Sequence, residues 1–518
     1  MAYQVGRGRR TAIAAAGFFF AALFGAFVAD AQLVGNPAGP RPGLVYELSL
    51  SPPEAASLAK LDELGFNVGH VTSQAASIFA TPGEYDYLVS HGYPVTIVGT
   101  QPSPPQYPRG VPRGSLGVYH SYADLTAMLN DFATNYPAIT RLISLGSSVQ
   151  GRQLWALLIS DNPLVQENEP EFKYVSTMHG DEPVGTEMCL YFIDHLLANY
   201  GVDSNITALV NGTAIWIVPL MNPDGLESGS RVNANGFDLN RSFPEYPSEF
   251  SGTIWNGYPN VVGLEPEVRH LMTWSTAHTF VLSANLHTGA VVASYPYDTD
   301  PPIPTAVPAP TPDNALFVAL ATTYASSNPP MSANNTAPFV NGIVNGNDWY
   351  IVEGGMQDWM YRYLGTDEIT LELSIPKKPS QALLPDYWDD NRDAMMAYLA
   401  WVHRGVRGTV TDSATSDPVF AVVNVVGNSQ AVFTDPEIGD YSRLLTPGTY
   451  DLLFTALYYE PVLVQNVVVT SGSATPLDVQ MTLATNLSGA GTGAMVLLMA
   501  LVILSGAIVL LVQPVRRV

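Results

Sequence analysis

The chain has 518 residues, of which 47% are hydrophobic and 13% are charged, and its formal net charge is −24 at pH 7. This length and composition suffice for two or three globular domains with substantial cores, and they exclude a disordered protein. The acidic balance argues against a broad basic surface for nucleic acid or anionic lipid. The single cysteine, Cys189, excludes an internal disulfide, and its place in an apolar helical stripe predicts a buried structural thiol.

The N-terminus has the features of an export signal. Three arginines precede the apolar residues 11–28, and the small residues Ala29 and Ala31 flank Asp30 as they do at a signal-peptidase site. We therefore predict a signal peptide over residues 1–31 and a mature, exported protein that begins at Gln32.

The C-terminus has the features of a membrane anchor. Residues 494–512 carry no charge and are long enough to cross a bilayer, a glycine-rich linker over 486–493 precedes them, and two arginines follow. Because flanking arginines stay on the cytoplasmic side, we predict a transmembrane helix and a cytoplasmic tail over 513–518. Most of the protein would then face the periplasm or the exterior. Bacterial C-terminal sorting tags share this layout, so retention or removal of the anchor is open.

The first folded unit precedes a proline-rich linker. Between residues 45 and 98 the pattern is strand, helix, strand, strand, helix, strand, which is the order of a ferredoxin-like α+β domain. The linker, residues 101–113, contains the single arginines Arg109 and Arg113. We assign residues 32–115 to this domain and its linker.

Two further units follow. Residues 116–404 alternate helical and strand patterns as an α/β domain does, and residues 405–485 contain only short strand-type runs separated by turn residues. The second pattern predicts a small antiparallel β-sandwich. Asn222-Pro-Asp-Gly is most simply a turn, and His195, His270 and His278 are expected on helices, either at the surface or around the site, and not as metal ligands.

Two short motifs carry the chemistry. His179 and Glu182 follow the apolar run 173–178, and His287 follows the apolar run 280–286, so all three residues are expected where strands end. Two histidines and one glutamate are the ligand set of a catalytic zinc that keeps its fourth position open for water. The sequence therefore predicts a zinc hydrolase with one Zn²⁺ per chain.

Further motifs follow in chain order. They are Arg231, Asn240-Arg241 within Gly-Phe-Asp-Leu-Asn-Arg, Tyr350 before Gly-Gly-Met-Gln-Asp, and Glu372 within Ile-Thr-Leu-Glu-Leu. With the three zinc ligands this constellation resembles the zinc metallocarboxypeptidase family, in particular its regulatory branch of carboxypeptidases D, E, M and N. The resemblance covers about residues 117–485 and implies a mixed-sheet α/β catalytic domain followed by a transthyretin-like β-sandwich.

The resemblance also implies a role for each motif. Glu372 would be the general base that takes a proton from water and passes it to the leaving amine. Arg231 would stabilise the oxyanion. Asn240 and Arg241 would bind the free α-carboxylate of the substrate, because a planar guanidinium can bond both oxygens at once. Tyr350 would close over the substrate from a loop.

Two residues are expected to set specificity. In the regulatory branch an aspartate in a Tyr-Pro-Tyr-Asp segment lines the pocket for the terminal side chain, and here Asp298 matches it, with Gln357 as its companion. A carboxylate in a partly buried pocket favours a cation, which predicts removal of C-terminal Arg or Lys. The alternative function, a cell-wall peptidase that recognises a diamino acid, remains open. A non-catalytic membrane-bound binding module is disfavoured, because every catalytic position is filled.

Three positions depart from the resembled pattern. Asp181 stands in place of Asn, Thr288 in place of Gly, and Ser242 in place of Asn, and the first could shift the pH optimum. The N-terminal unit resembles in outline the prosegments of digestive carboxypeptidases, so our hypothesis is that it shields the site until cleavage near Arg109 or Arg113. A permanent accessory domain is the alternative. We expect a monomer that acts on peptide or protein C-termini.

Overall fold

The computed structural model describes residues 44–51, 61, 67–71, 75–80, 82–102, 116–244 and 264–484. The predicted signal peptide, the two predicted linkers apart from residues 101–102, the transmembrane helix and the cytoplasmic tail lie outside the described residues. Within the described ranges, none of the helices combines the length and apolar character that a membrane crossing needs.

The N-terminal α+β domain has a four-stranded antiparallel sheet in the order β2-β3-β1-β4. Its described elements are β1 (Leu44–Leu50), β2 (Asn67–Val71), β3 (Ala76–Ala80), α2 (Pro82–Ser90) and β4 (Val95–Pro102). Apolar side chains that alternate along β1 and β3, such as Leu48 and Ile78, form the core with Leu88 of α2. This strand order confirms the ferredoxin-like plan; the predicted helix over 53–64 lies outside the described residues except Leu61.

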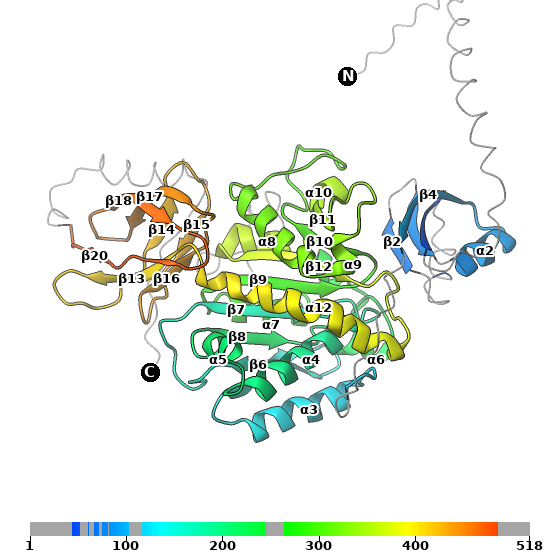
Figure 1. Ribbon diagram of the computed structural model, residues 1–518, viewed down its shortest axis with the longest axis horizontal. Helices are drawn as coiled ribbons and strands as arrows, with labels where there is room; N and C mark the ends of the chain where they lie inside the picture. Colours follow the sequence, from blue (N-terminus) through cyan, green and yellow to red (C-terminus); the bar gives the residue numbers. More distant parts are fainter. Residues whose placement is uncertain are drawn as a thin grey trace, which may run out of the picture. The chain divides into compact units, whose positions relative to one another are not determined.

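The central domain is built on an eight-stranded mixed sheet in the order β11-β10-β12-β9-β7-β8-β6-β5 (Figure 1). Strands β12, β9, β7 and β8 are parallel, as are β10 and β11, and the pairs β10–β12, β6–β8 and β5–β6 are antiparallel. The bounds are β5 (Thr140–Ser147), β6 (Gln153–Ile159), β7 (Glu171–Ser176), β8 (Ala214–Val218), β9 (Phe280–His287), β10 (Val291–Tyr295), β11 (Ile343–Asn345) and β12 (Asp367–Leu373).

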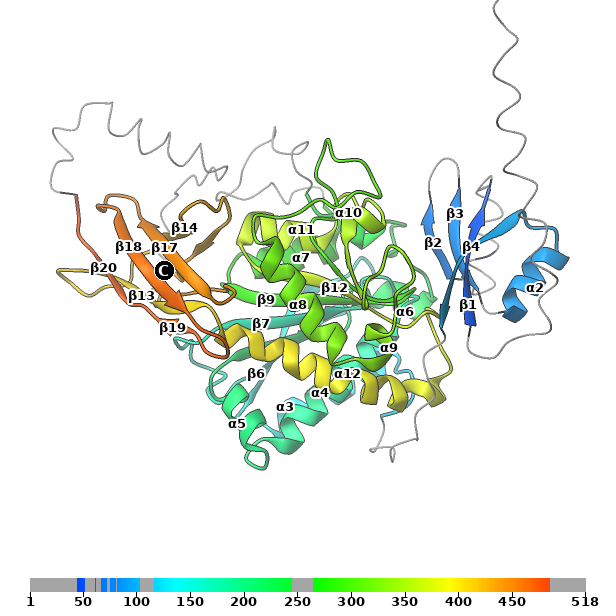
Figure 2. The same ribbon diagram turned by 45° about the horizontal axis from the view of Figure 1, so that its top comes forward.

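Helices cover both faces of this sheet, and two apolar clusters lie between them and the strands. Leu157 and Ile159 of β6 belong to the larger cluster, whereas Ala156 and Leu158 belong to the other, as the alternation of side chains along a strand requires. Helix α12 lies across the strands in both views (Figures 1 and 2). The larger cluster includes residues of α3 (Tyr122–Asn135), α4 (Val184–Asn199), α5 (Ser204–Val210), α8 (Asn314–Ser326) and α12 (Leu384–Leu399); the other includes residues of α7 (Pro266–Ser275) and α11 (Met356–Trp359).

Two local predictions for this domain need correction. The segment predicted as a turn begins a short helix, α6 (Pro223–Ser228), because Asn222 caps it by accepting a hydrogen bond from Gly225 N. The helix expected to reach His278 ends at Ser275, so His278 lies in the following turn, where its Nδ1 is 2.6 Å from Glu171 Oε2. Cys189 lies fully buried in α4, as predicted.

The C-terminal domain is the predicted β-sandwich. One sheet has the order β16-β13-β19, with β20 also on β13, and the other has the order β15-β14-β17-β18. It is not wholly antiparallel, because β13 pairs in parallel with β19 and β20. The bounds are β13 (Val406–Asp412), β14 (Val422–Val425), β15 (Ala431–Phe433), β16 (Asp440–Arg443), β17 (Gly448–Thr455), β18 (Val462–Val469), β19 (Thr475–Pro476) and β20 (Val479–Met481).

Candidate metal centre and active site

The loop between β7 and α4 carries His179 and Glu182. The chain turns sharply after β7, where Thr177 has a φ of 51° and its hydroxyl donates to the carbonyl of Glu182 at 3.1 Å. Gly180 lets this loop approach the Asn222–Gly225 turn, because a Cβ at that position would lie 2.0 Å from the Gly225 carbonyl carbon. The tight loop therefore places both side chains at the carboxyl end of β7.

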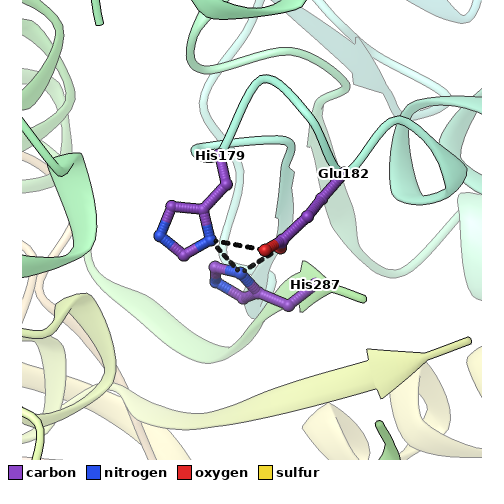
Figure 3. A group of neighbouring side chains, drawn as sticks. All are labelled: His179, Glu182 and His287. Atoms are coloured by element: carbon purple, nitrogen blue, oxygen red, sulfur yellow. Dashed lines mark hydrogen bonds and ion pairs between the residues drawn. The ribbon is translucent and has the colours of Figure 1, made fainter. Parts of the chain in front are cut away.

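His287 ends β9, the parallel neighbour of β7, and its side chain meets the other two (Figure 3). His179 Nδ1 lies 3.0 Å from Glu182 Oε1 and 3.0 Å from His287 Nδ1, and His287 Nδ1 lies 2.9 Å from Glu182 Oε2. All three residues are buried. Two ligand atoms about 2.1 Å from one tetrahedral zinc lie roughly 3.4 Å apart, so these spacings suit a single ion.

The chemistry of the donors also fits zinc. His179 Nε2 lies 3.0 Å from Asp238 Oδ1, which fixes the tautomer that donates from Nε2 and leaves the Nδ1 lone pair facing Glu182 and His287. Two imidazole nitrogens and a carboxylate that face one point would repel each other without a cation among them. His179, Glu182 and His287 are the only group of this kind in the described part of the chain.

Asp238 is a site residue that the sequence analysis did not single out. Besides His179 it accepts a hydrogen bond from Arg231 Nε at 3.0 Å, and Arg231 Nη1 donates to Glu182 Oε1 at 3.3 Å. Burial would raise the pKa of Asp238, but the neighbouring His179 and Arg231 outweigh burial and hold it far below its usual value. The only signal in the sequence was that a metal-binding histidine needs a carboxylate partner.

Glu372 reaches the metal centre through strand pairing. In the register between β12 and β9 it lies directly beside His287. Glu372 is 7% exposed, and its Oε2 has no hydrogen-bond partner among the described residues. Burial and the nearby Glu182 raise the pKa of Glu372 well above its usual value, while Arg231 and Lys377 lower it. A buried carboxylate with a free oxygen beside the metal ligands is placed to exchange protons.

The residues expected to bind the substrate carboxylate lie next to these groups. Asn240 and Arg241 belong to the short helix η1 (Leu239–Arg241), where Asn240 Oδ1 accepts from Met356 N at 3.0 Å and Arg241 exposes its side chain. Tyr350 follows α10 (Gly346–Trp349). Burial and Glu372 raise the pKa of the Tyr350 hydroxyl, whereas Arg241 and Arg231 lower it, so charges of both signs surround this side chain.

Asp298 and Gln357 lie together in a buried position. Gln357 Nε2 donates to Asp298 Oδ1 at 2.7 Å, and Gln357 Oε1 has no partner among the described residues. The backbone N–H groups of Asp298 and Thr299 donate to Asp358, a carboxylate that the sequence analysis did not anticipate. Burial and Asp358 raise the pKa of Asp298 well above its usual value, while Arg241 lowers it.

Comparison with known proteins identifies the family to which the chain belongs. A family model described as zinc carboxypeptidase matches residues 125–394, which is more than half of the chain. The chain belongs to the zinc carboxypeptidase family. A second model, described as carboxypeptidase regulatory-like domain, matches residues 405–482 and therefore the β-sandwich. Zinc is the cofactor that membership of this family implies, in agreement with the donor set of the metal centre.

Similar proteins include three mouse enzymes. Carboxypeptidase D of Mus musculus is 39% identical over 407 residues, which are 74% of this chain and 29% of that protein. Carboxypeptidase M is 42% identical over 64% of this chain and 76% of that protein. The carboxypeptidase N catalytic chain is 40% identical over 70% of this chain and 86% of that protein. The present chain thus spans less than a third of the length of carboxypeptidase D.

A solved structure agrees on the fold. The crystal structure of thrombin activatable fibrinolysis inhibitor has a TM-score of 0.50 at 17% identity and covers 69% of this chain and 98% of its own. At this level of identity the likeness concerns the fold alone. Together with the observed sheets, it confirms the mixed-sheet α/β fold predicted for the zinc carboxypeptidase domain.

Proposed function

We propose that the protein is a zinc-dependent metallocarboxypeptidase that removes C-terminal Arg or Lys from peptides or proteins outside the cytoplasm. The observation that carries this proposal is the register of β12 and β9, which puts Glu372 beside His287 while the three donors His179, Glu182 and His287 converge. A metal centre, a buried carboxylate beside it and an exposed arginine close by are the parts that hydrolysis of a terminal peptide bond requires.

Each side chain of the site then has its own role in the proposed hydrolysis. Zinc, when bound by His179, Glu182 and His287, supplies Lewis acidity and lowers the pKa of water. Glu372 accepts a proton from the attacking water and returns it to the leaving amine, since its free Oε2 is buried beside the metal ligands. Arg231, held by Asp238, stabilises the negative charge that develops on the carbonyl oxygen of the scissile bond.

Two further groups bind the end of the substrate. The exposed Arg241 interacts electrostatically with Tyr350 and Asp298, and with Asn240 it binds the free α-carboxylate, which makes the enzyme an exopeptidase. Asp298, oriented by Gln357, receives the cationic terminal side chain. A cation entering this pocket would favour the charged carboxylate, which burial otherwise disfavours.

The proposal extends to the setting of the enzyme. We propose export by a signal peptide over 1–31, one C-terminal membrane helix over 494–512, and a monomer whose catalytic domain, residues 116–404, faces the periplasm or the exterior. The N-terminal domain, residues 32–115, is proposed as a shield that cleavage near Arg109 or Arg113 removes. Equal activity of full-length and linker-cleaved protein on a small peptide would refute the shield.

The deciding experiment compares peptides that end in Arg, Lys, Phe or Glu, each with and without a chelator. We expect release of Arg and Lys, loss of activity with the chelator and recovery with Zn²⁺. Cell-wall fragments that end in a diamino acid are assayed in parallel, and their preference would favour the cell-wall alternative. Preference for Phe would overturn the assignment of Asp298 and leave the hydrolytic mechanism standing.

A further inference from the structure

Lys377 lies in the loop that follows β12, five residues after Glu372, and its side chain turns to the metal-ligand loop. Its Nζ is 2.5 Å from Asp181 Oδ2, and the two side chains are only 10% and 14% exposed. Asp181 directly precedes Glu182 in the chain. The pair therefore differs from an exposed surface ion pair, which solvent and salt weaken.

A second contact links Lys377 to the segment of another metal ligand, His287. Thr288, which directly follows His287, donates from Oγ1 to the backbone carbonyl of Lys377 at 2.9 Å. The backbone N–H of Thr288 also donates to Glu182 Oε2 at 3.2 Å. Lys377 thus connects the segment of Glu182, the segment of His287 and the loop after Glu372.

Both residues that contact Lys377 are departures from the resembled sequence pattern. Asp181 adds a negative charge next to Glu182 in the chain, and its Oδ1 is buried without a hydrogen-bond partner among the described residues. Its ion pair with Lys377 is the only one recorded for Asp181 in the described ranges. Without Lys377, this largely buried carboxylate would lose its ion pair and keep only the longer-range attraction of Arg231, which is costly.

We propose that Lys377 is a positioning residue for the hydrolysis proposed above, on which this inference rests. Its ammonium balances Asp181 and its carbonyl holds Thr288, so that the metal-ligand segments stay in place relative to Glu372. Among the described residues no hydrogen bond or ion pair joins Lys377 to His179, Glu182 or His287, so it acts through Asp181 and Thr288. Groups that orient metal ligands typically change metal affinity or activity by about 10- to 100-fold when removed.

The test compares Lys377→Met with Lys377→Arg in the full-length protein. Lys377→Met should lower kcat about tenfold or more while KM stays within about twofold, because positioning acts on the chemical step rather than on substrate affinity. Lys377→Arg keeps the positive charge and should recover most of kcat. Lys378→Met is the matched control, because the exposed Lys378 lies over the Tyr119 ring at 5.3 Å and makes neither contact; its kcat should equal that of wild type.

A second comparison removes the charge that Lys377 balances. Asp181→Asn combined with Lys377→Met should have a higher kcat than Lys377→Met alone, because no unbalanced carboxylate is left beside Glu182. Purely additive losses would contradict the proposal, as would a raised KM with unchanged kcat.

Zinc release to a chelator gives a readout that does not depend on catalysis. Release should be about tenfold faster from Lys377→Met than from wild type or Lys378→Met. A wild-type protein without activity on any peptide would refute the proposed function and leave this comparison valid. An active wild type with equal zinc release and equal kcat in both methionine variants would refute the role of Lys377 alone.

Discussion

Arg443 of the β-sandwich is bound to Asp313 of the central domain, and the pair is buried between the two. Its Nη2 donates to both carboxylate oxygens of Asp313, at 2.7 and 2.8 Å, and the arginine is 1% exposed. The Tyr361 hydroxyl donates to the same carboxylate at 2.8 Å. The sandwich is therefore joined to the zinc carboxypeptidase domain by a charged contact inside the protein, and a change there should affect the stability of both.

Substitution of Arg443 by Met should destabilise the protein by about 3–5 kcal/mol, because it leaves the Asp313 carboxylate buried without its cation. Urea unfolding at neutral pH measures the loss. Arg407→Met is the control, since Arg407 makes an exposed contact with the Asn168 carbonyl at 2.8 Å, and it should cost less than about 1 kcal/mol. Similar small losses for both variants would show that the buried pair adds little.

Substitution of Glu372 by Gln should abolish most of the activity and leave zinc binding intact. The amide cannot accept a proton from water, so kcat should fall by about a thousandfold with little change in KM. Zinc content is measured by elemental analysis on the same sample, because Glu372 is not one of the three converging donors. A variant that keeps a tenth of the wild-type kcat would contradict the role of Glu372 as general base.

Substitution of Asp298 by Asn should change specificity rather than chemistry. Because Asp298 is proposed to pair with a cationic terminal side chain, its loss should lower kcat/KM for peptides ending in Arg by about a hundredfold, with kcat/KM for Phe-ending peptides within a few fold. Asp300→Asn is the matched control, because Asp300 is more exposed and pairs with Arg362 at 3.1 Å. Equal losses on both peptides would mean that Asp298 serves the fold and not selectivity.

Much of the site lies where the sequence places it, because apolar strand runs end in polar residues. His179 and Glu182 follow β7, and His287 ends β9, so the expectation that these residues meet at the strand ends rested on local patterns. The side-by-side register of Glu372 and His287 did not, since it depends on β12 pairing with a strand 85 residues earlier in the chain. For Glu372 only the family resemblance pointed to that position.

Two of the contacts that sequence reasoning missed join separate loops. Asp238 meets His179, and Lys377 meets Asp181, across stretches of chain that carry no period or spacing to relate them. Asn222-Pro-Asp-Gly begins a helix although its residues suit a turn, because helix caps and turns favour the same residues.

Asp390 on α12 should make stability fall as pH rises from about 4 to 7. Burial, with Asp386 and Asp389 nearby, raises the pKa of Asp390 from 3.8 to about 7. A raised pKa means that the folded state favours the protonated form, so its stabilisation is complete below pH 4 and lost as pH approaches 7. The free energy of unfolding of Asp390→Asn should therefore exceed that of wild type by about 1–2 kcal/mol at pH 7, after discounting for solvent screening.

Urea unfolding at pH 4 and 7 measures this gain in stability. The exposed Asp389→Asn serves as control, and an equal gain for both variants at pH 7 would refute the assignment to Asp390.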